Sequence, residues 1–519
     1  MSKLVIAYHR PPYQEVVVDG QIVRQEHKSP NGIVPTLKSF FGRNNSGSWV
    51  AWISTDDVTD DFEPVVEIND SFGTYRVNRM PLAPEEVLSF YHVTSKEAMW
   101  PILHSFKERY NYDPVDWPTF REVNRKFAQT AAAEADDGDI VWVHDYNLWL
   151  VPKYLRQIKP ELKIAFFHHT PFPAADMFNV LPWRHEIVES LLCCDAIGFH
   201  IPRYTANFVA TARSLFDIDE LEDVPVRNEF SAVGMALSEH RAPTKIAHKG
   251  HEIHLSSHPV GVDVDYVEQV AHTPEADARM AEIKKDLGAC RLILSVSRTD
   301  YTKGGIEQLL AFERLLDRRP DLIGNVRLML VSVQAASAAY DAVQRDIEAL
   351  SGRINGQFGS FEWQPVALLS TPVPFGELVS YYRAADVCWI TPLCDGLNLV
   401  ASEFIAVQQE DADADVGALV LSEFAGAAVE LGDAILVNPF SHRAMDAAID
   451  RALDMSAAER RTRIISLKRK VRELDIRSWA TEQKRVFSLI RRAQDDVVVP
   501  LGVRTAKRQA KSRPGGGAA

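Results

Sequence analysis

The stretch DVCWITPLCDGLNLVASEF, residues 386–404, joins a buried strand to a helix and decides the fold of its half of the chain. DVCWI (386–390) is apolar on both faces, which is typical of a strand in a parallel sheet that is covered by helices on both sides. A Pro and a Cys-Asp-Gly turn follow, and then a helical pattern that carries Glu403. A purely structural junction needs only to turn, so Asp395 and Glu403 indicate that this one also binds a ligand.

The same alternation of short apolar strands and longer helical patterns runs through most of the chain. Strands are expected at 4–9, 49–54, 140–146, 163–169, 196–200, 292–298, 326–333, 386–390, 418–422 and 434–439. Near-continuous apolar strands separated by helices are typical of doubly wound parallel sheets in an α/β protein. The strands fall into two sets, so we expect two Rossmann-like domains that face each other across a cleft.

The boundary between the two sets is expected near residue 260. HLSSHPVGVD (254–263) has the pattern of an edge strand followed by a Pro/Gly crossover. SWATEQKRVFSLIRR (478–492) predicts a helix that crosses back onto the first domain. The expected division is an acceptor-side domain over 1–258, a donor-binding domain over 259–475, the returning helix within 476–500, and a disordered basic tail over 501–519.

The composition is that of a globular protein whose 519 residues are too many for one hydrophobic core. No run of about 18 uncharged apolar residues is present to span a membrane. The beginning, MSKLVIAYHR, lacks the pattern of a signal peptide, and the five cysteines lie in apolar runs, so we expect a cytoplasmic protein without disulfides. A net charge of −14 argues against general nucleic-acid binding, and it suits an anionic substrate only where basic residues gather in a cleft.

Polar side chains follow several predicted strands at their carboxyl ends, where ligands bind in open parallel sheets. They are His9 and Arg10, His144 and Asp145, His168 and His169, and Arg298. A single buried histidine is more often a hydrogen-bonded core residue, but two neighbouring strand ends of this kind favour a functional site. No His or Cys spacing of a zinc site occurs, and adjacent Cys193 and Cys194 cannot both face one ion, so no metal site is predicted.

Two turns have the chemistry of an anion site. SRTDYTKGG (297–305) follows a strand and opens a helix, so Arg298, Lys303 and free N–H groups could meet at one anion. SPNGIVPTL (29–37) places Gly32 at a helix start, where the backbone could approach a phosphate. Taken alone, the first is also compatible with a solvated basic turn, and the second is better explained as an ordinary turn. With the two carboxylates of the opening stretch, they suit the transfer of a sugar from a diphosphate.

Seven segments, in order along the chain, resemble the trehalose-6-phosphate synthase family of retaining glycosyltransferases. They are WVHDYNL (142–148), FFHHTPFP (166–173), SVSRTDYTKGG (295–305), SGRINGQFG (351–359), TPLCDGLNLVASEF (391–404), LSEFAGAAVEL (421–431) and LVNPF (436–440). The similarity extends from residue 4 to about 490. It implies a GT-B fold with the active site in the cleft, and no cofactor beyond the nucleotide-sugar substrate, with any effect of a divalent cation left open.

The resemblance also assigns roles to single residues. On the donor side it places Gly32, Arg298 and Lys303 at the diphosphate, Asp395 and His169 beside the glucose, the backbone of Gly396, Leu397, Asn398 and Leu399 near both, and Glu403 at the ribose. On the acceptor side it places Arg10, Tyr91, Trp100 and Asp145. Among all of these, it implies catalytic roles for Arg298, Lys303 and Asp145.

Three departures from the family pattern concern the acceptor. Asn31 and Asn147 stand where the family typically has Gly and His, and no arginine follows the strand at 326–333, where its place falls near Gln334. In the family, that arginine grips the phosphate of glucose 6-phosphate, so here the phosphate must be held elsewhere or the acceptor must be smaller. AYHRPPYQEV (7–16) and SPNGIVPTLKSFF resemble the glucosylglycerol-phosphate synthase branch, which joins glucose from ADP-glucose to glycerol 3-phosphate in salt tolerance.

The branch resemblance therefore predicts glucosyl transfer from ADP-glucose to glycerol 3-phosphate. The alternative is a trehalose-6-phosphate synthase that uses UDP- or ADP-glucose and glucose 6-phosphate. A catalytically silent sugar-phosphate sensor is disfavoured, because Arg298, Lys303, Asp395 and Glu403 are all present. The expected partners are small-molecule substrates, with no membrane and no specific nucleic acid, and a homo-oligomer is compatible with the sequence.

Overall fold

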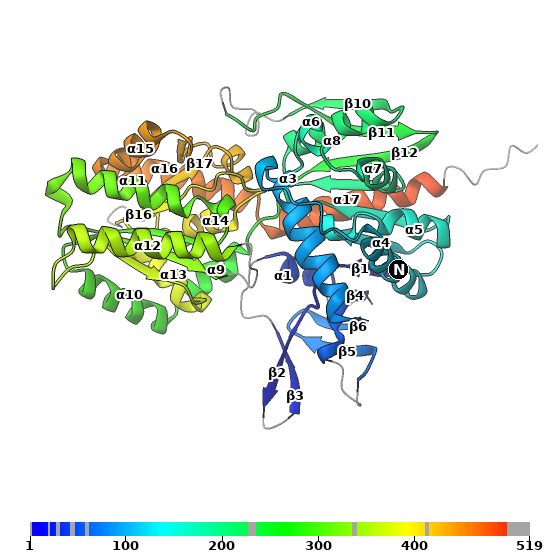
Figure 1. Cartoon of the computed structure of the whole chain (residues 1–519), viewed down its shortest axis with the longest axis horizontal. Helices are drawn as coiled ribbons and strands as arrows, with labels where there is room; N and C mark the ends of the chain where they lie inside the picture. Colours follow the sequence, from blue (N-terminus) through cyan, green and yellow to red (C-terminus); the bar gives the residue numbers. More distant parts are fainter. Residues whose placement is uncertain are drawn as a thin grey trace, which may run out of the picture.

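The computed structural model describes residues 3–18, 21–26, 32–41, 47–57, 62–226, 235–334, 340–410 and 415–495. Within these residues the chain forms two α/β halves, each built around one sheet (Figure 1). The predicted tail over 501–519, the end of the segment 476–500 and Asn31 lie outside the described residues.

The N-terminal half is built on a ten-stranded sheet in the order β10-β11-β12-β9-β8-β7-β1-β4-β6-β5. Its strands are β1 (Leu4–Ala7), β4 (Gly47–Ser54), β5 (Val65–Asp70), β6 (Gly73–Leu82), β7 (Ile140–His144), β8 (Lys163–Phe167), β9 (Ala196–Phe199), β10 (Asp219–Pro225), β11 (Arg241–His248) and β12 (His251–Ser257). The strands from β12 to β6 are parallel, while β10, β11 and β5 are added antiparallel. Every residue of β7 is buried, as expected for a central strand.

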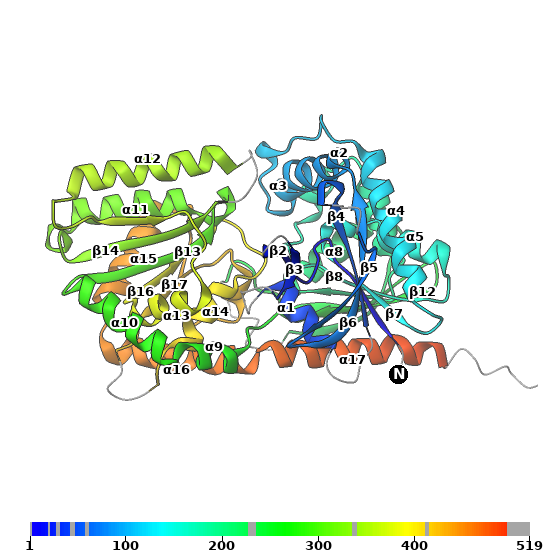
Figure 2. The ribbon, with the colours of Figure 1, turned by 90° about the horizontal axis from the view of Figure 1, so that it is seen from below.

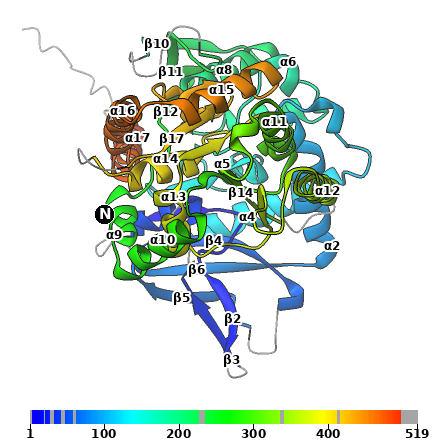
Figure 3. The same ribbon diagram turned by 90° about the vertical axis from the view of Figure 1, so that its left-hand side faces the viewer.

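The C-terminal half is built on a six-stranded sheet whose neighbouring strands are all parallel. Its strands, in spatial order, are β15 (Val366–Leu369), β14 (Val326–Val333), β13 (Arg291–Arg298), β16 (Val387–Ile390), β17 (Ala418–Ser422) and β18 (Ile435–Val437). All ten predicted strands are present, which confirms the prediction of two parallel sheets. A separate hairpin of β2 (Gln14–Val18) and β3 (Gln21–Gln25) projects from the N-terminal half (Figure 3).

Helices cover both sheets (Figure 2). Those of the N-terminal half are α1 (Ile33–Lys38), α2 (Pro84–Val87), the π-helix η3 (Leu88–Met99), α3 (Trp100–Leu103), α4 (Trp117–Glu134), α5 (Val151–Ile158), α6 (Ala175–Phe178), α7 (Arg184–Leu191) and α8 (Pro202–Leu215). Those that follow are α9 (Val264–Ala271), α10 (Pro274–Leu287), the 3₁₀ turn η7 (Tyr301–Lys303), α11 (Gly305–Arg318), α12 (Asp341–Phe358), α13 (Phe375–Ala384), α14 (Leu399–Val407), α15 (His442–Asp454), α16 (Ala457–Glu473) and α17 (Ile476–Asp495).

The prediction that 254–263 contains an edge strand is wrong. β12 lies inside the sheet, paired with β9 on one side and with β11 on the other, and β10 forms the edge. β11 has the sequence RAPTKIAH, and most residues of β10 are exposed or half-buried. Neither strand therefore shows the continuous apolar pattern that identified the central strands: β10 lies at the edge and buries no residue fully, and β11, although paired on both sides, has only half of its residues buried.

The chain passes between the two halves twice, and the two passages touch. The Ile476 N–H donates a hydrogen bond to the carbonyl oxygen of Val262 at 3.2 Å. A Cβ atom on Gly261 would lie 2.1 Å from the carbonyl oxygen of Leu474, so only glycine fits there. The predicted division at 258/259 falls just before the first passage, between β12 and α9, and stays a prediction.

After the second passage, α17 lies against the ten-stranded sheet and contacts β8 and β12 (Figure 2). Its Trp479 is fully buried, with ring centroids 5.4 Å from Trp142 of β7 and 5.3 Å from Phe167 of β8. The C-terminal helix therefore packs into the core of the N-terminal half.

Candidate active site

Two adjoining cavities, each of about 290 Å³, lie where the carboxyl ends of the two sheets meet. We call them the Trp100 cavity and the Leu399 cavity, after a residue that lines only one of them. They share Ile33, His169, Arg298, Lys303 and Asp395. Because these five residues line both, the cavities form one site with two compartments, at the position that open parallel sheets use for ligands.

An ion pair joins the two loops of the C-terminal half that reach this site. Lys303, at the end of η7, places its ammonium 2.7 Å from Oδ2 of Asp395 in the loop after β16. Asn398 donates to the same oxygen at 3.1 Å, and its own Oδ1 accepts from the Ala401 N–H and caps α14. Burial raises the pKa of Asp395, but the Lys303 charge outweighs it and holds that pKa below its usual value. Asp395 is therefore ionised and fixed in position.

Gly304 lets these two loops pack backbone against backbone. It has a φ of 72°, and a Cβ atom there would lie 2.2 Å from the carbonyl oxygen of Thr391. The Leu393 N–H donates to the carbonyl oxygen of Thr302 at 2.7 Å in the same contact. The glycine of the TKGG turn thus has a structural cause, which is the close approach that brings Lys303 to Asp395.

In the N-terminal half, Asp145 and His169 follow the neighbouring strands β7 and β8. The His169 N–H donates to Oδ1 of Asp145 at 3.3 Å. Burial raises the pKa of the Asp145 carboxyl to about 6, although N–H groups of Tyr146 and His169 oppose the shift. Nδ1 of His144 lies 3.1 Å from Nε2 of His169, and burial lowers the pKa of both imidazoles well below the usual value. The site therefore holds a carboxyl that titrates near neutral pH beside neutral histidines.

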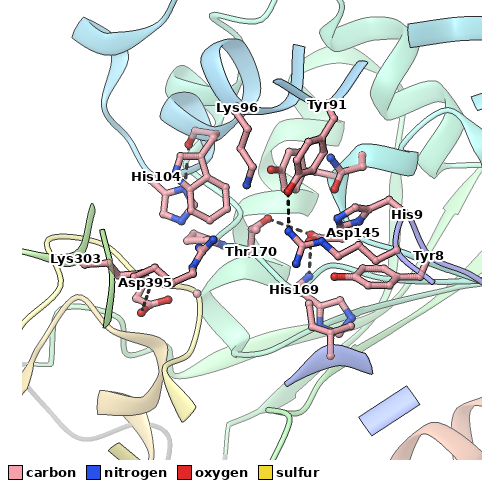
Figure 4. A pocket seen from close by; sticks show the side chains of 18 residues that line it. Tyr8, His9, Tyr91, Lys96, His104, Asp145, His169, Thr170, Lys303 and Asp395 are labelled. Atoms are coloured by element: carbon pink, nitrogen blue, oxygen red, sulfur yellow. Dashed lines mark hydrogen bonds and ion pairs between the residues drawn. The ribbon is translucent and has the colours of Figure 1, made fainter. Parts of the chain in front are cut away.

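The π-helix η3 supplies the far wall of the Trp100 cavity. Its i to i+5 repeat places Tyr91 and Lys96 on one face, and both point into the cavity (Figure 4). The Tyr91 hydroxyl accepts a hydrogen bond from Nη2 of Arg10 at 2.7 Å. The Lys96 ammonium lies 4.4 Å from the ring centroid of Trp100, which directly follows η3. Cations and aromatic rings thus line this wall together.

The comparison with known proteins identifies the family. The profile of glycosyltransferase family 20 matches residues 2–488. The chain belongs to glycosyltransferase family 20. It is 47% identical over 501 residues to the glucosylglycerol-phosphate synthase of Synechocystis sp., covering 96% of this chain and 98% of the relative. It is 46% identical over 488 residues to that of Picosynechococcus sp., covering 93% and 97%.

A solved structure also resembles this family 20 enzyme. It is an α,α-trehalose-phosphate synthase (UDP-forming) from Burkholderia xenovorans in complex with glucose-6-phosphate. The two have a TM-score of 0.79 and are 26% identical, over 94% of this chain and all of the other. The predicted fold class, a GT-B fold built on two largely parallel sheets, is thereby confirmed.

The fold of the glycosyltransferase brings most of the predicted site residues together. Of the predicted residues, the Trp100 cavity alone is lined by Arg10, Tyr91, Trp100, Asp145 and Gly396. The Leu399 cavity alone is lined by Gly32, Leu397, Asn398 and Leu399. Both cavities are lined by His169, Arg298, Lys303 and Asp395. Glu403 is the exception among the described residues, because it lines neither cavity. It is buried and accepts a hydrogen bond from the Tyr382 hydroxyl at 2.9 Å.

Several lining residues of the glycosyltransferase were not predicted. Tyr8, Lys96, His104, Tyr146 and Thr170 line the Trp100 cavity, and His200 lines the Leu399 cavity. Lys96 had a signal, because it lies within YHVTSKEAMW between Tyr91 and Trp100. Conversely, His168 is a core residue: its Nδ1 lies 3.0 Å from the Thr170 carbonyl oxygen, and its ring stacks on Trp149.

Within the described residues of this family 20 enzyme, no group of three or more His, Cys, Asp and Glu side chains could hold a metal ion. The five cysteines are free. In the same part of the chain, no helix is both long and apolar enough to cross a membrane.

Proposed function

We propose that this glycosyltransferase moves glucose from ADP-glucose to the 2-hydroxyl of glycerol 3-phosphate, with retention at the anomeric carbon. The products are 2-O-(α-D-glucosyl)glycerol 3-phosphate and ADP, and the proposed setting is compatible-solute synthesis in the cytoplasm of salt-stressed cells. The observation that carries the proposal is the identity of 46–47%, over nearly full length, to two glucosylglycerol-phosphate synthases. Trehalose-6-phosphate synthases are less similar, and that of Mycolicibacterium gilvum is 36% identical over 484 residues.

The end of β14 also supports an acceptor other than glucose 6-phosphate. The family arginine that would bind the phosphate of that sugar is replaced near Gln334. Gln334 itself is exposed, and it is not among the described residues that line either cavity. A site that lacks this bidentate cation loses a strong contact to a phosphate at that position.

For the chemical step, we place the nucleotide sugar in the Leu399 cavity and the acceptor in the Trp100 cavity. The bond between the anomeric carbon and the diphosphate oxygen breaks, and the acceptor oxygen bonds to the same face of the carbon. The acceptor proton passes to the departing diphosphate oxygen. Arg298, Lys303 and the first N–H groups of α14 would stabilise the charge that grows on that diphosphate, since Arg298 and Lys303 line both cavities and Leu399, at the start of α14, lines the cavity assigned to the donor.

The test is a comparison of substrates with the purified enzyme. ADP-glucose and UDP-glucose are each offered with glycerol 3-phosphate and with glucose 6-phosphate, and the products are identified by NMR. We expect an α-glucosidic product from ADP-glucose and glycerol 3-phosphate. Formation of trehalose 6-phosphate at a higher kcat/KM would replace the proposal with trehalose-6-phosphate synthesis.

The raised pKa of Asp145 predicts a pH dependence. If the Asp145 carboxylate accepts a hydrogen bond from an acceptor hydroxyl, activity requires its ionised form, which predominates above pH 6. The ratio of wild-type to Asp145→Asn kcat/KM should then rise about tenfold between pH 5 and 7. The acceptor phosphate titrates in the same range, but it does so for both proteins and cancels in the ratio.

The same variant also tests the titration of Asp145 through stability, which should fall with rising pH where the activity ratio rises. The folded-state pKa of Asp145 lies above its ordinary value of 3.8, so the folded protein binds this proton more tightly than the unfolded chain does. The contribution of protonated Asp145 to the free energy of unfolding is therefore fully present below about pH 4, and it is lost as the pH rises through about 6. Relative to Asp145→Asn, the wild type should show a falling Tm over that window. If neither the Tm difference nor the activity ratio between the wild type and Asp145→Asn changes with pH, the predicted titration of Asp145 is contradicted.

A further inference from the structure

Lys96 is a charged residue of the Trp100 cavity to which the resemblance assigns no role. Its ammonium lies 4.4 Å from the ring centroid of Trp100 and 5.4 Å from that of Tyr91. The side chain of Lys96 points toward the cavity (Figure 4). No carboxylate of the described residues lies within 4.0 Å of the ammonium. The lysine is thus aimed into the cavity without an ion-pair partner in the described part of the chain.

The charges around Lys96 favour an anion in this cavity. The cations that line it are Arg10, Lys96, Arg298 and Lys303, and the carboxylates are Asp145 and Asp395. Lys303 and Asp395 neutralise each other, so the remaining lining has more positive than negative charge. Arg298 also packs over the Trp100 ring, at 6.0 Å, which brings two positive charges to one indole. Burial lowers the pKa of Lys96, Tyr91 and Asp300 oppose the shift, and the charges of Arg298 and Arg10 add to it, so an anion beside Lys96 would offset the cost of its burial and of the neighbouring cations.

The two cavities divide these cations between two anions. Arg298 and Lys303 line both cavities, and they are the cations that the donor diphosphate would meet. Arg10 and Lys96 line the Trp100 cavity alone. Arg10 already donates to the Tyr91 hydroxyl, whereas the Lys96 ammonium donates no hydrogen bond to any residue that the structure describes, which leaves its three N–H donors for a phosphate.

We propose that Lys96 binds the phosphate of the acceptor and takes over the function of the arginine that is missing near Gln334. The inference rests on the proposed function and adds the residue that selects a phosphorylated acceptor. The phosphate lies at the η3 wall, between Lys96 and Arg10, and the reacting hydroxyl points toward Asp145 and His169 in the same cavity. This arrangement suits a short phosphorylated polyol, because phosphate and reacting hydroxyl share a single cavity of about 290 Å³.

Lys96→Met tests this role, because methionine keeps most of the length that packs on Trp100 and removes the charge. Loss of a charge-assisted contact should raise the KM for glycerol 3-phosphate about 10–100-fold. The KM for ADP-glucose, the slow hydrolysis of ADP-glucose without acceptor, and the use of unphosphorylated glycerol should stay within about twofold of the wild type. Lys96→Arg keeps the charge and should recover most of the affinity for glycerol 3-phosphate. The matched control is Lys107→Met, at an exposed lysine that lines neither cavity.

The outcomes separate this inference from the proposed function. An unchanged KM for glycerol 3-phosphate in Lys96→Met overturns the role of Lys96 and leaves the proposed reaction standing. An equal loss of affinity for ADP-glucose, glycerol 3-phosphate and glycerol has the same consequence, because it shows that Lys96 acts only on the structure of the site. If the wild type does not use glycerol 3-phosphate, the proposed reaction fails. Calorimetric binding of inorganic phosphate to the ADP-bound enzyme then decides the role of Lys96: weaker binding in Lys96→Met than in Lys107→Met supports it, and equal binding overturns it.

Discussion

Arg298→Ala should lower turnover about 10²–10³-fold while the protein stays folded. The side chain is exposed at the end of β13 and lines both cavities, where it would meet the charge that develops on the departing diphosphate. Among the described residues it forms no ion pair, so its removal leaves no buried charge without a partner. The measurement is kcat at saturating concentrations of both substrates, together with the Tm of each protein.

Two further variants sharpen the Arg298 experiment. Arg298→Lys keeps the positive charge and loses the planar fork, so its turnover should fall between those of the wild type and Arg298→Ala. Arg443→Ala removes an exposed arginine of α15 that lines neither cavity, and it should behave as the wild type. Normal turnover in Arg298→Ala would refute the assignment of this residue to the diphosphate.

Asp395→Ala should damage both stability and activity. It removes the partner of Lys303, and the two side chains are only 14% and 15% exposed, so the ammonium is left mostly buried and unpaired. Breaking such a pair costs about 3 kcal/mol in the free energy of unfolding. Loss of the carboxylate that is proposed to hold the donor glucose should also lower kcat/KM for ADP-glucose about 10–100-fold.

A double-mutant cycle distinguishes these two effects. In the Asp395→Ala/Lys303→Met protein no charge is left without a partner, so its Tm should recover toward that of the wild type, while activity should remain lost. The single Lys303→Met variant completes the cycle. Strictly additive changes in Tm would show that the Lys303–Asp395 pair does not stabilise the folded protein.

The sequence predicted the central strands of both sheets and the edge strand β18, and it missed the strands that lie toward the other margins. Strands such as β7 and β16 are buried on both faces and are therefore apolar throughout, which makes them easy to recognise. β5 alternates between exposed and buried positions, β10 is largely polar, and β15 has only four residues. Their place in the fold depends on the neighbour with which they pair, and the local pattern does not contain that information.

The same distinction applies to the site. Arg298, Lys303, Asp145 and Asp395 lie at the ends of strongly apolar strands, where sequence alone indicates a ligand. Lys96 faces the cavity because η3 is a π-helix, in which residues five apart share a face. The ordinary helical repeat places Lys96 on the face of Trp100, four residues further on, but separates Lys96 from Tyr91, so the sequence pattern indicates only part of this wall. The Lys303–Asp395 pair required the tertiary structure, since 92 residues separate its members.

The contact of Gly261 with Leu474 has a consequence for how the enzyme opens. We expect two chain segments that cross at the same place to act as a pivot, which would resist sliding of one half over the other and leave rotation about the crossing as the easier motion. The packing of α17 on the ten-stranded sheet fixes one side of that pivot. Both cavities would then widen and narrow together through a single angle, so that substrate entry, exclusion of water and release of product share one mechanical coordinate.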